Sequence, residues 1–281
     1  MKPLQVNHHN ALLDQFHDNG YLILPDFIPS EDCDCLMARM GELVDEFAQT
    51  EQVTSVFSTL THEHTQDRYF LESADEIYYF FEKDALGEDG LLYSIRESLN
   101  KVSHALHDKD PVFNEFCCHD RLRSLMVNLG YLDPVIRQSM YIFKQARIGG
   151  EVAMHQDSTF LHTNGKPVVG LWFALEDATL DNGCLWVIPR GHKGPLRQKF
   201  MRHDDDSLTF ATLDVTPYDL DAAMPLEVKK GTVIVLHGLL PHASKPNTSG
   251  QSRHAFTLHM TDRQDGFPVG NWMRGYDDTT A

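Results

Sequence analysis

The sequence lacks the features that would place it in several common protein classes. No apolar run approaches the roughly 18 residues needed to cross a bilayer, so no membrane span is predicted. It contains no Gly-rich phosphate loop and no alternating strand–helix pattern, which argues against a nucleotide-binding Rossmann sheet. The first residues carry no apolar signal core, and the last five (DDTTA) are not a peroxisomal address. A cytoplasmic location is therefore predicted.

Positive charge and paired cysteines are also scarce. Lys and Arg number 24 against 41 Asp and Glu, which gives a formal net charge of −17. A chain this acidic would repel a phosphate backbone, so no nucleic-acid partner is predicted. The five cysteines form neither a CxxC pair nor a zinc knuckle, which indicates reduced thiols in a reducing compartment.

What is present is typical of a globular domain, with 42% hydrophobic and 23% charged residues. The first half has helical spacing, with one short strand predicted at 21–24. Ser30 is predicted as the N-cap of a helix whose apolar positions run to Phe47, because Glu31 and Asp32 suit its first turn. The other predicted helices lie at 10–19, 98–107, 111–117 and 121–129.

The pattern changes near residue 135 to short runs rich in β-branched and aromatic residues, separated by Gly, Pro, Asn and Asp. Several short strands of this kind predict a mainly β sandwich or jelly-roll barrel. The predicted strands lie at 135–145, 168–175, 184–188, 228–236 and 254–260.

A histidine and an aspartate stand two residues apart at His155 and Asp157. Residues i and i+2 of an extended segment point to the same face, so both side chains can reach one ion. A third ligand from a distant strand would complete the two-His-one-carboxylate triad of Fe(II) oxygenases, with positions left open for co-substrate and oxygen. The pair is weak alone, since about one or two such pairs are expected by chance in a chain with 16 histidines.

A second pair, His203 and Asp205, lies in an acidic run and is predicted to be a solvated loop. The third ligand has two candidates, because His237 and His242 both follow the apolar segment 232–236. His242 is favoured, since it lies just past the strand, where ligands at a barrel mouth are usually found, while His237 remains the alternative.

A 2-oxoglutarate co-substrate would need a cation for its distal carboxylate. Arginine suits this role best, because its rigid fork matches a carboxylate with two parallel hydrogen bonds. Arg253 begins the strand after His242 and is the candidate, with a surface salt bridge as the alternative role.

Six segments between about residue 14 and residue 273 carry further motifs: Gly20–Pro25, Lys101–His107, Gln138–Lys144, Gly150–Asp157, Asn182–Pro189 and His242–Arg253. In these motifs and in their order the chain resembles the phytanoyl-CoA dioxygenase family.

The resemblance implies one domain over residues 1–281, with a mostly helical flank at 1–130 and a double-stranded β-helix core, the cupin-like jelly roll, at 131–262. It implies Fe(II) held by His155, Asp157 and His242, and Arg253 bound to the far carboxylate of 2-oxoglutarate. It implies O2 as the other co-substrate, with ascorbate as the in vitro reductant. Five further positions are implied to line the co-substrate pocket: Lys101, Met140, Gln156, Trp172 and Ser244. Core packing is the alternative for Met140 and Trp172, and a helix-surface lysine is the alternative for Lys101.

The resemblance also bears on the reaction. Related iron halogenases carry Gly or Ala where this chain has Asp157, so hydroxylation of a C–H bond in a small organic substrate is expected. The absence of an N-terminal targeting presequence departs from the peroxisomal hydroxylase and puts phytanoyl-CoA itself in doubt. An acyl-CoA or a lipid-like acid is the expected substrate class, and no oligomeric state is predicted.

A basic stretch bears on the same question. Five cations follow the iron motif, and they could attract the phosphates of a CoA thioester or belong to a solvated loop. They are Arg190, Lys193, Arg197, Lys199 and Arg202.

Two other functions are considered, a metal-bearing jelly-roll module without catalysis and a zinc or manganese hydrolase. The intact triad with Arg253 argues against the module, and a hydrolase would not need Arg253.

Overall fold

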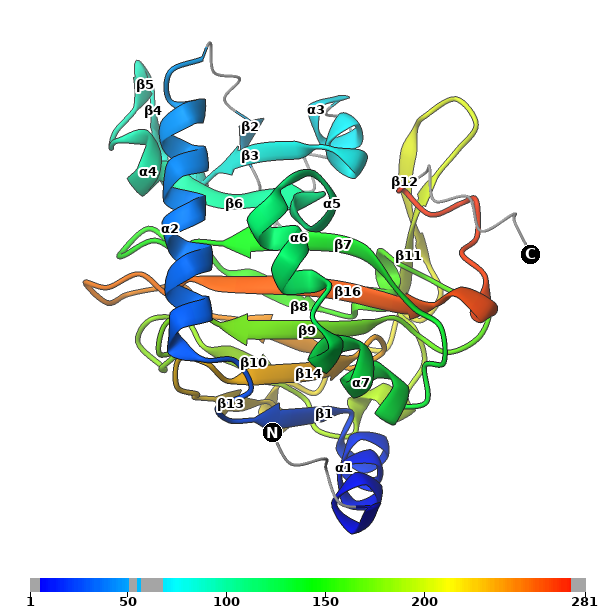
Figure 1. Ribbon diagram of the computed structural model, residues 1–281. Coiled ribbons are helices and arrows are strands. Elements are labelled where there is room, and N and C mark those ends of the chain that lie inside the picture. Colours follow the sequence, from blue (N-terminus) through cyan, green and yellow to red (C-terminus); the bar gives the residue numbers. More distant parts are fainter. Residues whose placement is uncertain (1–5, 51–54, 57–67, 274–281) are drawn as a thin grey trace.

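The computed structural model describes residues 6–50, 55–56 and 68–273 (Figure 1). Gly20, at φ +83°, ends the first helix, because glycine adopts this left-handed conformation without a steric penalty. The α-helices are α1 (Val6–Asn19), α2 (Ser30–Phe47), α3 (Arg68–Glu72), α4 (Ile95–Ser98), α5 (Leu106–Lys109), α6 (Pro111–Cys117) and α7 (Asp120–Asn128). Within the described residues, no helix is both long and apolar enough to cross a membrane.

The strands form two main sheets. The larger has the order β1-β14-β9-β16-β7-β6-β3-β2, and the smaller has the order β13-β10-β15-β8. The larger sheet contains β1 (Tyr21–Leu24), β2 (Ser55–Val56), β3 (Ile77–Phe81), β6 (Leu99–His104), β7 (Pro134–Ile142), β9 (Val169–Ala174), β14 (Val233–His237) and β16 (Ala255–Asp262). The smaller contains β8 (Val152–His155), β10 (Leu185–Val187), β13 (Met224–Leu226) and β15 (His242–Ser244). Two hairpins complete the set: β4 (Leu86–Gly87) with β5 (Gly90–Leu91), and β11 (Gln198–Arg202) with β12 (Leu208–Thr212).

Side chains alternate across the larger sheet as the two-residue period of a strand requires. On β16, Phe256 and Leu258 pack into the main apolar core with side chains of α2, α6 and α7, the helices that cover this face in Figure 1. Thr257 and His259 point the other way, into a cavity also lined by the smaller sheet. The two sheets of this jelly roll therefore enclose a cavity, while the helices shield the outer face of one of them.

The structure corrects several predicted elements. Ser30 is the first residue of α2, not its N-cap, and no side chain caps this helix end. The helix predicted at 98–107 is largely strand β6, which pairs with β3 and β7; only the end of α4 at Ser98 and the start of α5 at Leu106 are helical there. The sheet also extends past the expected boundary near residue 130, because β1, β2, β3 and β6 all join the larger sheet.

Candidate functional site

Two histidines meet where the smaller sheet pairs its neighbouring strands. His155 ends β8 and His242 begins β15, and the two are register partners in that antiparallel pair. His155 Nδ1 lies 2.8 Å from the Ala153 carbonyl oxygen, and His242 Nδ1 lies 3.0 Å from that of Leu240. A carbonyl only accepts hydrogen bonds, so both Nδ1 atoms carry a proton. Each Nε2 therefore keeps the lone pair that a metal needs.

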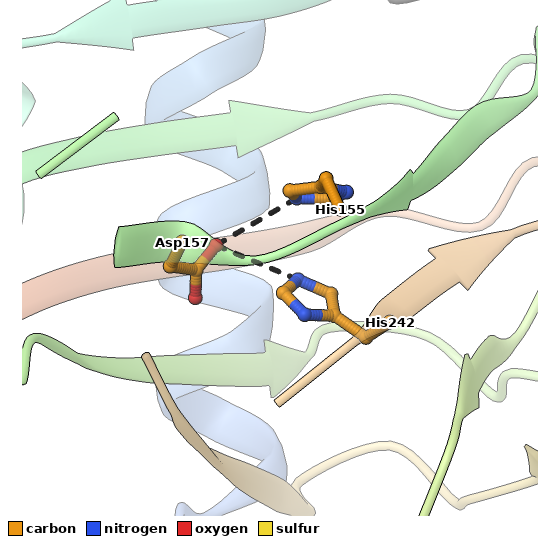
Figure 2. A group of neighbouring side chains, drawn as sticks. All are labelled: His155, Asp157 and His242. Atoms are coloured by element: carbon orange, nitrogen blue, oxygen red, sulfur yellow. Dashed lines mark ion pairs between the residues drawn. The ribbon is translucent and has the colours of Figure 1, made fainter. Parts of the chain in front are cut away.

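Asp157 completes the cluster from the turn that directly follows β8 (Figure 2). Its Oδ1 lies 3.7 Å from His155 Nε2 and 3.5 Å from His242 Nε2. The three ligand atoms lie within 4.8 Å of one another, and all three side chains line the cavity. The arrangement offers two imidazoles and one carboxylate to a single ion and leaves its other positions open to the cavity.

The electrostatics prepare these groups for a metal. Burial lowers the pKa of His242 to about 4, so its imidazole is neutral at pH 7. Burial alone would raise the pKa of Asp157, but the imidazoles of His242, His259 and His155 outweigh it and hold this pKa well below its ordinary value. A carboxylate beside a neutral imidazole is the protonation state in which these groups bind a divalent cation.

A buried arginine lies on another wall of the same cavity, whose volume is 610 Å³. Arg253 is 1% exposed, and its guanidinium lies 5.1 Å above the centre of the Trp172 ring. Burial lowers its pKa to about 10, so it stays charged at neutral pH. Among the described residues, neither its Nε nor its Nη1 has a hydrogen-bond partner. A buried guanidinium with unpaired donors is costly unless an anion joins it, which fits a carboxylate ligand.

Two buried lysines accompany this arginine. Burial lowers the pKa of Lys101 to about 7, and burial together with Arg253 lowers the pKa of Lys144 to about 7. Lys144 Nζ donates a hydrogen bond to Ser244 Oγ at 2.8 Å, and Lys101 Nζ lies 3.9 Å from Met140 Sδ. Arg253 and the charged fraction of the two lysines make this wall of the cavity positive at neutral pH, in an otherwise acidic protein.

The predicted co-substrate residues separate into two groups. Those that line the cavity are Lys101, Met140, Trp172, Ser244 and Arg253. Gln156 does not line it. Its Nε2 donates to the carbonyls of Leu239 and Pro195, and its Oε1 accepts from the Arg197 backbone. The structure thus places Gln156 between loops, whereas its predicted contact with the co-substrate stays a prediction.

The two alternatives considered for the metal site, the His203–Asp205 pair and His237, lie outside the cluster. His203 and Asp205 lie exposed in the turn between β11 and β12, where His203 Nε2 is 2.7 Å from Thr209 Oγ1. His237 lies beside His192 with ring centroids 4.8 Å apart and the ring planes tilted by 57°, and its Nδ1 accepts from the Leu239 backbone. The cluster contains His242 and not His237.

Sequence reasoning missed three residues at this site: Lys144, Gly170 and His259. A Cβ at Gly170 would lie 2.8 Å from Asp157 Oδ2, so this glycine makes room for the carboxylate. His259 Nε2 lies 3.4 Å from Asp157 Oδ1. Alternation along the strand could have revealed it, since Arg253, Thr257 and His259 share one face at even spacing. No comparable signal marks Gly170 or Lys144.

Known proteins of similar sequence cover almost the whole chain. The family model described as phytanoyl-CoA dioxygenase (PhyH) matches residues 16–255. The chain is 44% identical over 265 residues to the phytanoyl-CoA dioxygenase of Arabidopsis thaliana, covering 93% of this chain and 92% of the relative. It is 39% identical over 272 residues to phytanoyl-CoA dioxygenase domain-containing protein 1 of Rattus norvegicus, covering 93% of each.

Solved structures support the fold at lower identity. EctD from S. alaskensis in its apoform has a TM-score of 0.67 at 16% identity, covering 99% of this chain and 86% of that one. The epimerase SnoN, in complex with Fe3+, alpha ketoglutarate and nogalamycin RO, has a TM-score of 0.66 at 14% identity, covering 98% and 92%. The sequence matches and the shared fold agree with the site geometry, and the chain belongs to the phytanoyl-CoA dioxygenase family.

Proposed function

We propose that this protein is an Fe(II)- and 2-oxoglutarate-dependent dioxygenase that hydroxylates a C–H bond of a small organic substrate. The observation that carries the proposal is one cavity that holds both the His155–Asp157–His242 cluster and the charged, unpaired donors of Arg253. The donor set fits Fe(II), and the positive wall fits a dicarboxylate. When bound, the iron would couple decarboxylation of 2-oxoglutarate by O2 to insertion of one oxygen atom into the substrate, giving succinate and carbon dioxide.

The chain's own residues have separable tasks in this reaction. His155, Asp157 and His242 would hold the metal, with the Nδ1 protons of both histidines fixed by backbone carbonyls. Arg253 would bind the far carboxylate of 2-oxoglutarate, and its low exposure would keep water from that ion pair. With iron bound, Asp157 would take the coordination position that a halide would need, which supports hydroxylation over halogenation.

The rest of the cavity wall bears on the substrate. Phe160, Leu161, Phe210 and Trp272 line it, which supports an apolar, lipid-like substrate. The basic stretch gives less support to a CoA thioester, because three of its five cations pair with carboxylates. The pairs are Lys193 with Asp18 at 3.5 Å, Arg197 with Asp214 at 2.6 Å and Arg202 with Asp206 at 2.9 Å. Among the candidates, a lipid-like acid is therefore favoured over an acyl-CoA.

The test is succinate formation by purified protein with Fe(II), 2-oxoglutarate, O2 and ascorbate. We expect slow turnover without substrate and faster turnover with lipid-like acids than with the matching acyl-CoA thioesters. If neither lipid-like acids nor acyl-CoA thioesters accelerate succinate formation, the proposed substrate class is contradicted. No succinate under any condition, despite metal binding, would instead favour a non-catalytic metal-binding module.

We also propose a cytoplasmic location. It is supported by five thiols that form no disulfide, three of them buried (Cys33, Cys117 and Cys184). A fluorescent fusion that collects in an organelle would contradict it.

A further inference from the structure

We propose that His259 is a positioning residue that orients the Asp157 carboxylate for the metal by donating a hydrogen bond from its Nε2. The proposal rests on the proposed function, since it assigns a role at the same metal site. His259 lies on β16 of the larger sheet, whereas the three ligands come from β8, the turn after it, and β15 of the smaller sheet. The contact therefore joins the two sheets at the metal centre.

The geometry separates His259 from the ligands. Its Nε2 lies 3.4 Å from Asp157 Oδ1, the oxygen that also faces His155 and His242. Yet His259 stands outside the cluster whose ligand atoms all lie within 4.8 Å of one another. It reaches the carboxylate without joining the group that could share one ion. This position suits a residue that orients a metal ligand, and it does not suit a fourth ligand.

Of the three histidines near Asp157, His259 is the one that can donate a hydrogen bond to its carboxylate. His155 and His242 each give their Nδ1 proton to a backbone carbonyl and present a bare Nε2, so neither can donate to Asp157 once a metal is bound. In the described chain, these three histidines are the only side chains that form an ion pair with Asp157. His259 Nδ1 is buried and has no partner among the described residues. A carboxylate only accepts, so the His259 tautomer that satisfies this contact carries its proton on Nε2.

The backbone around His259 makes room for this contact. The pairing of β16 with β7 shifts register between His259 and Met260, and such bulges re-aim side chains near active sites. On the other side, His259 pairs with Gly170 of β9. A Cβ there would lie 2.8 Å from Asp157 Oδ2 and 3.8 Å from His259 Cδ2. A side chain at this strand partner would therefore crowd the carboxylate, and glycine has none.

The test measures Fe(II) binding to apoprotein under anaerobic conditions, by calorimetry, for four variants. His259→Gln keeps a donor near the Nε2 position, His259→Asn moves the donor to the Nδ1 position, and His259→Leu removes it. His162→Leu is the matched control, because His162 is similarly buried and also has an unpartnered Nδ1, but does not line the cavity. Thermal unfolding of each apoprotein reports whether the fold is intact.

We expect His259→Leu and His259→Asn to weaken Fe(II) binding about 10- to 100-fold, as changes at residues that orient metal ligands do. His259→Gln should bind within about threefold of the unchanged protein, and His162→Leu should bind as the unchanged protein does. If the His259→Leu variant does not fold, the comparison of His259→Gln with His259→Asn still tests the proposed role of His259.

Equal Fe(II) affinity in all His259 variants would overturn the proposal, and so would a loss in Gln as large as that in Asn. A protein that binds Fe(II) with this pattern but forms no succinate would contradict the proposed function and leave the role of His259 standing.

Discussion

The chain contains the same three-residue motif twice, in two very different settings. His155 and Asp157 lie at the end of a strand between two sheets, and Asp157 is 5% exposed. His203 and Asp205 lie in the exposed turn of the β11–β12 hairpin. Asp205 accepts hydrogen bonds from the backbone and side chain of Ser207, and these bonds lower its pKa.

The difference lies in what the surrounding fold adds to each pair. The buried pair has a third histidine opposite it and cations across the cavity. The exposed pair faces solvent, and its side chains form hydrogen bonds with Ser207 and Thr209 of the same hairpin. A His-x-Asp motif becomes a metal site through the neighbours that the fold supplies, and the following predictions test that contrast, from the largest expected effect to the smallest.

Removing the buried carboxylate should have the largest effect. Asp157→Ala takes away one of three ligands, so we expect succinate formation to fall below detection and Fe(II) affinity to drop by at least about a hundredfold. The measurement is succinate release with Fe(II) and 2-oxoglutarate present. Normal turnover in this variant would contradict the assignment of Asp157 as a ligand.

Removing the cation across the cavity should affect the co-substrate and spare the metal. Arg253→Met deletes a buried partner of a carboxylate, so the KM for 2-oxoglutarate should rise by about a hundredfold, equivalent to about 3 kcal/mol. Fe(II) affinity without 2-oxoglutarate should stay within about threefold. A proportional loss of both affinities would show that Arg253 supports the fold of the whole cavity instead.

The pH dependence of co-substrate binding should report the buried lysines. Lys101 and Lys144 have pKa values lowered to about 7, so both are charged below that pH and lose their charge above it. A neutral lysine attracts a dianion less, so the KM for 2-oxoglutarate should rise between pH 6 and pH 8.5. Lys101→Met should give a higher KM at pH 6 and a shallower rise. If Lys101→Met has the same pH profile of KM as the unchanged protein, Lys101 lies outside the co-substrate site.

The exposed pair should tolerate the same change with little effect. Asp205→Ala should leave succinate formation and Fe(II) affinity unchanged, and should alter the free energy of unfolding by no more than about 0.5 kcal/mol. It is the matched control for Asp157→Ala. A large loss of turnover would contradict the view that this hairpin turn is only a solvated loop.

The sequence predicted some of this architecture because local pattern and tertiary structure agree there. Strands β7, β9 and β16 coincide with short runs rich in β-branched and aromatic residues, so their predicted ranges were close to the observed ones. Strand β6 (Leu99–His104) instead lies within the helix that the sequence predicts at 98–107. Pairing with β3 and β7 decides the conformation there, and it buries Lys101, so the alternative of a helix-surface lysine is wrong.

The residues of the site also fall into those that the sequence could predict and those that it could not. The proposed ligands His155, Asp157 and His242 carry donor atoms that a motif can reveal. Gly170 matters because of where the register of β9 and β16 places it, and no local pattern encodes that register.

Gln156 has a consequence for any effort to redesign substrate choice. It stands between two proposed metal ligands in the sequence. Its amide nitrogen donates to the carbonyls of Leu239, in the turn before His242, and of Pro195, before the β11–β12 hairpin. Its Oε1 also accepts from the hydroxyl of Tyr218, whose loop lines the cavity. Loop exchange is a common engineering route to new specificity, but here a grafted loop must bring its own partners for Gln156. Substrate range and metal retention in this protein would therefore change together.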